Sequence, residues 1–250
     1  MAGHARRVTS MARRALKQKK HMKPSNLINL ETYRTRKQQV HLLPRNLHQE
    51  DYLALIDDSN KHIVFASGPA GTGKTMIACH KAIEALKTGV ADRVVITRPA
   101  VSVDEQHGFL PGSLLEKMAP WTRPIFDCFE EYYTPQEISG MIADNKIEVA
   151  PLAYMRGRTF KDAWIIADEM QNATPSQMKM LLTRIGNNSK FIITGDLAQH
   201  DRGYEDNGLA DFIQHLRSTN SDMIGLVEFE NRDIERHAAV NEVLSIYNNQ

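Results

Sequence analysis

The feature that most constrains this chain is an eight-residue segment that fits the pattern G-x-x-x-x-G-K-[ST]. Its residues are Gly68-Pro69-Ala70-Gly71-Thr72-Gly73-Lys74-Thr75. The glycines of such a loop let backbone N–H groups turn toward phosphates, and the helix that follows adds partial positive charge. The segment therefore predicts a loop that binds a nucleoside triphosphate. Lys74 would reach the β- and γ-phosphates, and the Thr75 hydroxyl would bind Mg²⁺.

The residues around this segment match the context that a phosphate loop needs. Residues 62–66 form a short apolar run rich in β-formers, which predicts a buried strand before the loop. From Met76 onward, apolar residues recur at helical spacing until Gly89, which predicts a helix after it. The alternative is a glycine-rich turn in an unrelated fold, and this context disfavours it.

Strand-like and helix-like segments alternate along the rest of the chain. The expected strands are 62–66, 93–97, 147–150, 163–167, 190–194 and 224–226 or slightly beyond, and a helix is expected at 48–57. This alternation predicts an α/β fold with a mostly parallel sheet covered by helices on both faces, as in RecA-like P-loop NTPases. Thr174, Pro175 and Gln177 predict a capped helix start, with a buried stripe that runs to Ile185 before Gly186 ends the helix.

Composition limits the class of protein. Hydrophobic residues make up 42% of the 250, enough for a substantial core. No apolar stretch approaches the roughly 20 residues of a membrane span, and no secretory signal is evident. The two cysteines, Cys79 and Cys128, show no ligand-like spacing. We therefore expect an intracellular, cytoplasmic protein without a membrane partner.

Charge divides the chain into two parts. Residues 1–48 hold 12 of the 31 Lys and Arg residues, and their one acidic residue is Glu31. We expect residues 1–47 to form a basic, flexible extension and residues 48–250 to form the folded domain. The extension suits a polyanion such as nucleic acid. Two alternatives remain open: a solvated tail, or a tail that docks on the acidic body of a neighbouring subunit.

A second motif supplies two adjacent acids at the end of a predicted strand. Residues 164–167 are apolar and lead directly into Asp168 and Glu169. Ligands of open α/β sheets collect at the carboxyl ends of the strands. Asp168 is placed to hold Mg²⁺, and Glu169 to orient and deprotonate an attacking water. The alternative is an ordinary surface Asp-Glu pair, which this position after a buried strand disfavours.

A third strand, at 190–194, leads into Asp196 and Gln199. We expect the Gln199 amide to donate to the γ-phosphate and to report its presence. An ordinary loop glutamine would be the better interpretation if the other two motifs were absent.

The motifs together resemble those of the PhoH family, which is similar to the N-terminal core of superfamily-one helicases. The resemblance runs from about Gln49 to the C-terminus through the phosphate loop, residues 97–101, 108–112, 155–159, 168–172 and 195–199. It implies ATP binding with Mg²⁺, a link to phosphate starvation and, for some relatives, helicase-like activity on RNA. A compact chain with a divergent basic tail would also suit a phage-borne copy, acting in the host cytoplasm.

The resemblance assigns further roles. Gln49 occupies the position that reads the adenine edge in helicase-like proteins; the alternative is an exposed glutamine at a helix start. Arg98 occupies the position that contacts the nucleic-acid backbone; the alternative is an arginine paired with a nearby carboxylate. The segment 145–148 departs from the guanine-reading pattern N-K-x-D because it ends in Glu148, so guanine is disfavoured.

Related helicases complete their ATP site with arginines from a second domain, which this sequence is not expected to contain. The resemblance therefore implies a head-to-tail oligomer, with a hexameric ring as the expectation, in which a neighbour supplies an arginine. The candidates are Arg156, Arg158, Arg202 and Arg236, and we favour the pair Arg156 and Arg158.

Two functions from different classes remain. The first is a Mg²⁺-dependent ATPase that moves on, or remodels, single-stranded RNA or DNA. The second is an ATP-switched nucleic-acid-binding or regulatory module without unwinding activity. Few aromatic residues interrupt the basic segments, which offers little platform for base stacking and weakens the first function. A small-molecule kinase is a distant third, because adjacent acids suit water as the nucleophile.

Overall fold

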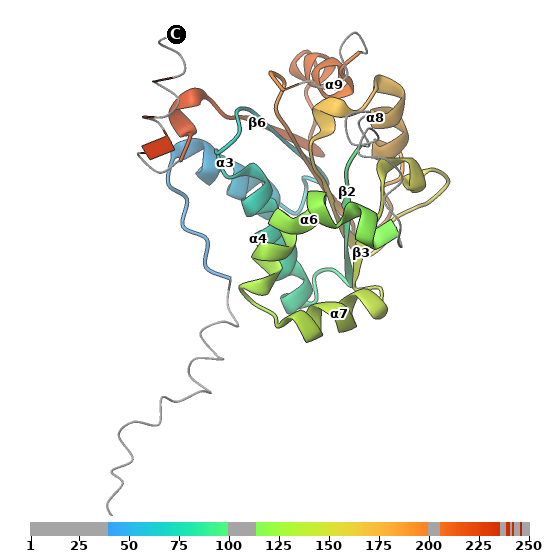
Figure 1. Ribbon diagram of the computed structural model, residues 1–250. Helices are drawn as coiled ribbons and strands as arrows, with labels where there is room; N and C mark the ends of the chain where they lie inside the picture. The colour runs from blue at the N-terminus through green and yellow to red at the C-terminus, as the bar shows by residue number, and fades with distance from the viewer. Residues whose placement is uncertain are drawn as a thin grey trace, which may run out of the picture. The chain divides into compact units, whose positions relative to one another are not determined.

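The computed structural model describes residues 40–99, 114–199 and 206–235, together with positions 239, 240, 242 and 246. With the labels of Figure 1, the helices and strands are α3 (Leu47–Asp57), β1 (Ile63–Ser67), α4 (Lys74–Thr88), β2 (Arg93–Thr97), α6 (Leu114–Glu130), α7 (Pro135–Ala143), β3 (Ile147–Val149), η2 (Leu152–Met155), β4 (Ala163–Ala167), η3 (Met170–Asn172), α8 (Pro175–Leu182), β5 (Lys190–Gly195), α9 (Gly208–Arg217), β6 (Ile224–Glu228) and η4 (Asn231–Asp233).

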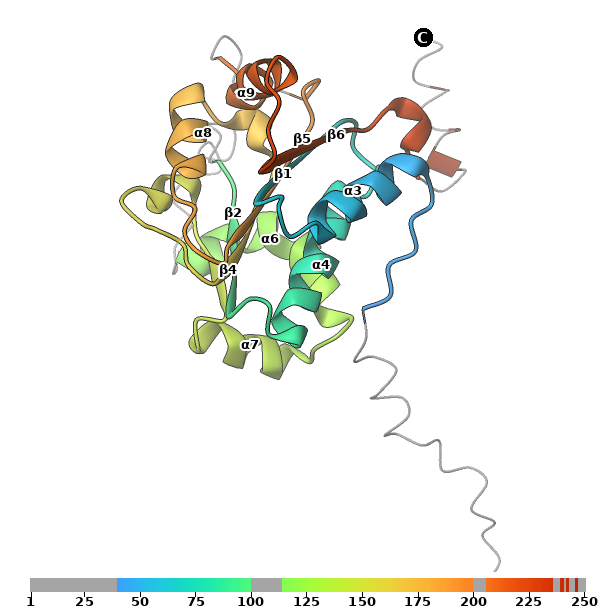
Figure 2. The ribbon, with the colours of Figure 1, turned by 180° about the vertical axis from the view of Figure 1, so that it is seen from behind.

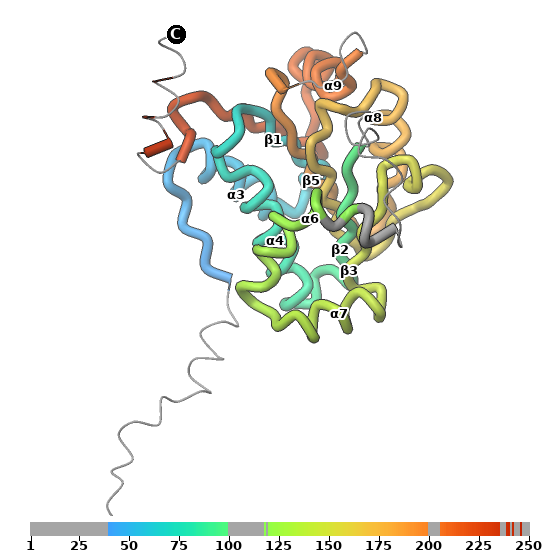
Figure 3. The backbone as a smooth tube through the Cα atoms, viewed as in Figure 1, coloured from blue at the N-terminus to red at the C-terminus, as the bar shows by residue number. Residues whose placement is uncertain are grey.

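The strands form one six-stranded sheet in the order β3-β2-β4-β5-β1-β6. Figure 3 traces the backbone through this sheet and labels β1, β5, β2 and β3. Every recorded pair of neighbouring strands is parallel. Because parallel strands end at the same edge, the segments that follow β1, β4 and β5 meet there. β5 lies between β1 and β4, so the loop after β5 is flanked by the other two.

The two faces of the sheet bury alternate residues of each strand, as a period of two requires. Val64, Ile166 and Ile192 pack in a core with residues of α3, α4, α6 and α7. Phe65 and Ile165 pack on the opposite face with residues of η2, α8 and α9. Figures 1 and 2 show these two helical layers from opposite sides. The predicted α/β fold with both faces covered is confirmed.

The expected strands agree with the structure to within one or two residues, and the capped start of α8 is confirmed. The Thr174 side chain accepts from the Gln177 N–H, and the Gln177 side chain accepts in return from the Thr174 N–H. The predicted extension of this helix to Ile185 is wrong, because α8 ends at Leu182. Ile185 instead forms an isolated parallel bridge with Phe160, so contacts across the fold end the helix early.

The folded domain includes residues before position 48. Val40 and Leu42 are partly buried and pack against the same core as α3 and α4. Among the helices in the described ranges, none is long and apolar enough to cross a membrane.

Candidate active site

The phosphate-loop segment connects β1 to α4 at the carboxyl edge of the sheet. Gly68, Gly71 and Gly73 have φ values of 144°, 90° and 86°, a region that favours glycine. Gly73 is the N-cap of α4 and offers no side chain to the first turn. The first N–H groups of an α-helix have no partner within the helix. The loop therefore directs helix N–H groups and partial positive charge toward an anion.

Lys74 is buried against the loop that precedes it. Its Nζ donates to the carbonyl oxygens of Gly68 and Pro69, both at 2.7 Å, and lies 3.3 Å from Thr72 Oγ1. Burial lowers the pKa of Lys74, and the carboxylates of Asp196, Glu169 and Asp168, in decreasing order of effect, oppose this shift. The predicted phosphate-binding cation thus lies within electrostatic reach of the acids that follow β4 and β5.

Thr75 and Asp168 come from different elements and meet directly. The Thr75 hydroxyl donates to Asp168 Oδ1 over 2.8 Å, and the Thr194 hydroxyl at the end of β5 donates to the same oxygen. The Asp168 N–H donates to the carbonyl oxygen of Thr97 at 3.0 Å, which anchors the residue to β2. Hydroxyl and carboxylate oxygens are hard ligands that fit Mg²⁺, which protein sites bind through one or two carboxylates together with substrate phosphates.

Glu169 is held in an unusual conformation beside Asp168. Its φ of 54° and ψ of 38° lie in the left-handed region, which is uncommon for a residue other than glycine. Gln171 Nε2 donates to Glu169 Oε2 at 2.6 Å, while Gln171 Oε1 accepts from the Asp196 N–H at 3.1 Å. Because Gln171 is fully buried, it fixes the Glu169 carboxylate relative to the loop that follows β5.

Gln199 lies on that loop, between the ends of β1 and β4. Its backbone N–H donates to the carbonyl oxygen of Asp196 at 3.1 Å, and the residue is exposed. The structure therefore brings its backbone to the edge that carries Lys74, Asp168 and Glu169. Its contact with a γ-phosphate stays a prediction.

Gln49 is buried, with 3% of its surface exposed, so the alternative of an exposed glutamine at a helix start is wrong. Its Nε2 donates to the carbonyl oxygen of Thr72 at 3.0 Å, and its Oε1 accepts from the Arg45 N–H at 2.9 Å. Gln49 thus contacts the phosphate loop directly. Both ends of its amide are bonded to the main chain of this protein.

The predicted arginines have different environments. Arg98 is half-buried just beyond β2, and its carbonyl oxygen accepts from the Leu152 N–H at 3.0 Å. Arg156 is exposed. Arg158 forms a two-pronged ion pair with Glu148 on β3, with one N–O distance of 2.7 Å, and its guanidinium lies 4.7 Å from the centre of the Phe160 ring. This pairing makes Arg158 a weaker candidate than Arg156. Arg202 and Arg236 lie outside the described residues.

Sequence reasoning missed Thr194 and Gln171 as parts of the site. Both lie within segments that the motifs already covered, at the end of β5 and just after the acidic pair. A strand-end threonine beside the predicted magnesium carboxylate was the available signal, because the carboxyl ends of parallel strands lie side by side. Gln171 had no such signal, since a turn of η3 brings its amide back to Glu169.

The fold and this site define the P-loop NTPase class of α/β proteins. A family model described as "PhoH-like protein" matches residues 41–248. The chain belongs to the PhoH family, as the sequence motifs predict.

Individual relatives agree with this membership. A "PhoH-like protein" of Mycobacterium bovis is 43% identical over 225 residues, which cover 90% of this chain and 62% of that protein. A "PhoH-like protein" of Bacillus subtilis is 43% identical over 82% of this chain and 64% of its own length. "Protein PhoH" of Escherichia coli is 43% identical over 82% of this chain and 58% of its own length. The chain thus spans about three fifths of the length of these relatives.

Proposed function

We propose that this protein binds ATP together with Mg²⁺ and hydrolyses it. The observation that carries the proposal is the direct contact between Thr75, at the start of α4, and Asp168, at the end of β4. This contact joins the phosphate loop to the acidic pair. It supports one site that holds a triphosphate, a divalent cation and a general base.

The roles follow from the chemistry of the side chains. The loop N–H groups and Lys74 bind the β- and γ-phosphates, and Thr75 and Asp168 hold Mg²⁺. Glu169 orients a water and accepts its proton as the water oxygen bonds to the γ-phosphorus. The bond between that phosphorus and the bridging oxygen breaks, and ADP leaves with the electron pair. Gln199 donates to the γ-phosphate.

Phosphate release from ATP, with and without Mg²⁺, tests this proposal. Glu169→Gln should still bind ATP but lose about 10²- to 10⁴-fold in turnover, the usual contribution of a general base. Lys74→Ala should weaken nucleotide binding and abolish hydrolysis. Glu131→Gln makes the same chemical change at an exposed position and should keep parental turnover. If Glu169→Gln hydrolysed ATP at the parental rate, Glu169 would not be the general base.

We also propose that turnover is coupled to single-stranded RNA or DNA. The net basic charge of residues 1–48 and the position of Arg98 at the carboxyl edge of the sheet support this coupling. Stimulation of ATP turnover by single strands, lost in Arg98→Ala, is the expected result. Binding of single strands that weakens with salt and responds to ATP, without unwinding of duplexes, would favour the switched binding module instead.

Deletion of residues 1–23 should lower polyanion affinity and leave the fold intact. A link to phosphate starvation stays a prediction from the family resemblance.

The position of Arg156 supports a head-to-tail oligomer. Arg156 is exposed directly after η2, so its side chain is accessible to a neighbouring subunit. We propose a ring, with a hexamer as the expected size. Mass photometry that detects only monomers in the presence of ATP and Mg²⁺ would contradict it.

A further inference from the structure

Two segments far apart in the sequence contact the phosphate loop. The first is the N-terminal turn of α3, where Gln49 Nε2 donates to the carbonyl oxygen of Thr72. Gln49 is itself held in place, because its Oε1 accepts from the Arg45 N–H and its backbone N–H donates to Asn46 Oδ1 at 2.9 Å. The Gln49 amide therefore connects the start of α3 to the loop by hydrogen bonds at both of its ends.

The second segment is residues 229–235, which follow β6. The Phe229 N–H donates to the carbonyl oxygen of Ser67 at 2.7 Å, and the Glu235 N–H donates to that of Gly71 at 2.9 Å. A Cβ atom on Gly68 would lie 2.5 Å from the Phe229 carbonyl oxygen, so the two backbones are in close contact. Residues 229–235 thus follow the loop from its first residue to its middle.

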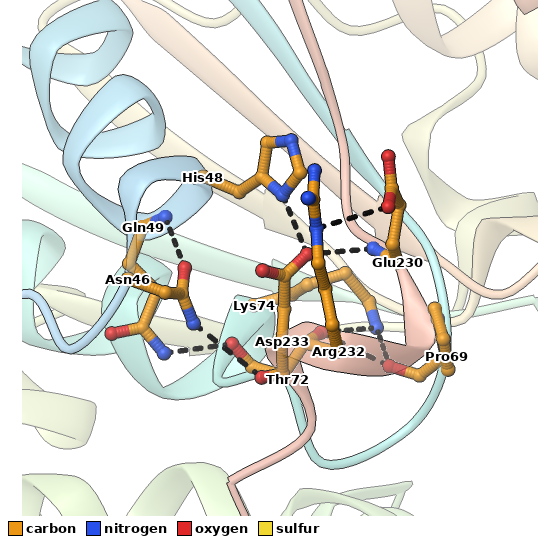
Figure 4. Close-up of polar contacts among 9 residues, drawn as sticks. All are labelled: Asn46, His48, Gln49, Pro69, Thr72, Lys74, Glu230, Arg232 and Asp233. Carbon is orange, nitrogen blue, oxygen red and sulfur yellow. Dashed lines mark hydrogen bonds and ion pairs between the residues drawn. The ribbon is translucent and has the colours of Figure 1, made fainter.

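The pair His48 and Asp233 joins these two segments (Figure 4). His48 Nδ1 lies 2.5 Å from Asp233 Oδ2, and the Glu230 N–H donates to the same oxygen at 2.7 Å. Burial raises the pKa of Asp233, but the hydrogen bonds with Glu230 and His48, together with the electrostatic effects of His48 and Arg232, outweigh burial and lower the pKa overall. Asp233 is thus a buried carboxylate that binds α3 to the segment after β6.

We propose that Gln49 and Asp233 are positioning residues that clamp the phosphate loop in its phosphate-binding conformation. Gln49 holds the loop by its hydrogen bond to Thr72. Asp233 holds the segment after β6 against His48 of α3, and Glu235 of the same segment donates to the loop at Gly71. Their contacts are with the main chain of the loop and with α3, so the clamp serves every nucleoside triphosphate alike. This inference rests on the proposed binding of a triphosphate at the loop.

The test measures binding affinity, because affinity does not depend on turnover. The probes are ATP, GTP and inorganic tripolyphosphate, which carries no base. Gln49→Glu keeps the acceptor for the Arg45 N–H but removes the donor to Thr72. It should lower the affinity for all three probes by a similar factor of about 10 to 100, as a misplaced binding group does. Asp233→Asn should lower the three affinities in the same proportion, although Asp233 does not contact the probes.

Asp51→Asn is the control: it makes the same charge change as Asp233→Asn, and Asp51 is exposed on α3, the helix that carries Gln49. Its affinities should equal those of the parental protein. Thermal unfolding checks that each variant folds, and His48→Ala replaces Asp233→Asn if that variant does not. His48 is 22% exposed, so its loss is the milder change.

Two results would overturn the clamp. A selective loss of ATP affinity in Gln49→Glu, with tripolyphosphate unaffected, would make Gln49 a base reader. If Gln49→Glu and Asp233→Asn both kept the parental affinities for all probes, neither residue would hold the loop in its phosphate-binding conformation. Failure of the parental protein to bind any of the three probes would instead contradict the proposed function, and with it the clamp.

Discussion

Asp168 Oδ1 accepts hydrogen bonds from two hydroxyls, that of Thr75 on α4 and that of Thr194 on β5. Thr75 is part of the phosphate-loop pattern, whereas Thr194 is not. Groups that hydrogen-bond to a metal-binding carboxylate orient it, and their loss commonly lowers metal affinity about 10- to 100-fold. The contact therefore connects a residue outside the phosphate-loop pattern to the proposed magnesium site.

We expect Thr194→Val to lower the affinity for Mg²⁺ by about 10- to 100-fold, because the carboxylate loses one of its two orienting donors. Titration of ATP turnover with Mg²⁺ measures this effect. Thr97→Val is the matched control, since the Thr97 hydroxyl is buried and has no hydrogen-bond partner among the described residues. Its replacement removes an unsatisfied polar group and should leave Mg²⁺ affinity unchanged. Equal effects of the two variants would contradict the role of Thr194.

Gln171 couples Glu169 to the loop after β5, so its replacement should affect the chemical step. In Gln171→Glu the acceptor for the Asp196 N–H remains, but the donor to Glu169 is replaced by a like charge. We expect kcat to fall by about 10- to 100-fold with little change in KM for ATP, because the base loses its orientation while the phosphate loop is intact. Steady-state kinetics measure both constants.

Gln214→Glu provides the comparison for Gln171→Glu, because Gln214 is exposed on α9. It should keep the parental kcat. A rise in KM in Gln171→Glu, with kcat unchanged, would place Gln171 in ground-state nucleotide binding instead.

The sheet and the phosphate loop could be predicted from the sequence because their signals are local. Apolar runs such as 163–167 define buried strands, and the pattern from Gly68 to Thr75 defines a strand-loop-helix unit. The end of α8 could not be predicted, because it is set by the pairing of Ile185 with Phe160, 25 residues earlier. Local periodicity carries no information about such a pairing.

The same distinction applies to the site. Asp168 and Glu169 could be found because they end a buried strand. The environment of Gln49 could not, because it depends on where α3 meets the loop, 23 residues away in the sequence. The ion pair of Arg158 was equally hidden, since Arg158 and Glu148 lie in different segments with no shared motif. Residues whose roles depend on contacts between segments need the structure.

Arg156 provides a test of catalysis between subunits. If it completes a neighbour's site, Arg156→Ala should lower turnover by about 10³-fold or more while the stability of the protein is unchanged. Mixing Arg156→Ala with the inactive Lys74→Ala should restore part of the activity, because some interfaces then combine an intact loop with an intact arginine. No recovery on mixing, with subunit exchange verified, would exclude the transfer of Arg156 between subunits.

The ion pair of Arg158 with Glu148 should contribute to stability in a pH-dependent way. Hydrogen bonds from Arg158, with the charges of Arg158 and Arg93, lower the pKa of Glu148 against the opposing effect of burial. A carboxyl whose pKa is lower in the folded state stabilises the fold above its unfolded-state pKa, near 4.3. That contribution is lost as the pH falls through the folded-state value.

We therefore expect Arg158→Met to reduce the free energy of unfolding at pH 7 by up to about 1 kcal/mol, the range of a partly exposed ion pair. The difference from the parental protein should shrink as the pH falls below about 4.3, because Glu148 is then protonated in both unfolded chains. Urea unfolding at several pH values measures this difference in the free energy of unfolding. Arg156→Met makes the same change at an exposed neighbour and should leave stability unchanged at every pH. A pH-independent loss in Arg158→Met would instead assign the contribution of Arg158 to packing on Phe160, since contact with an aromatic ring does not require an ionised carboxylate.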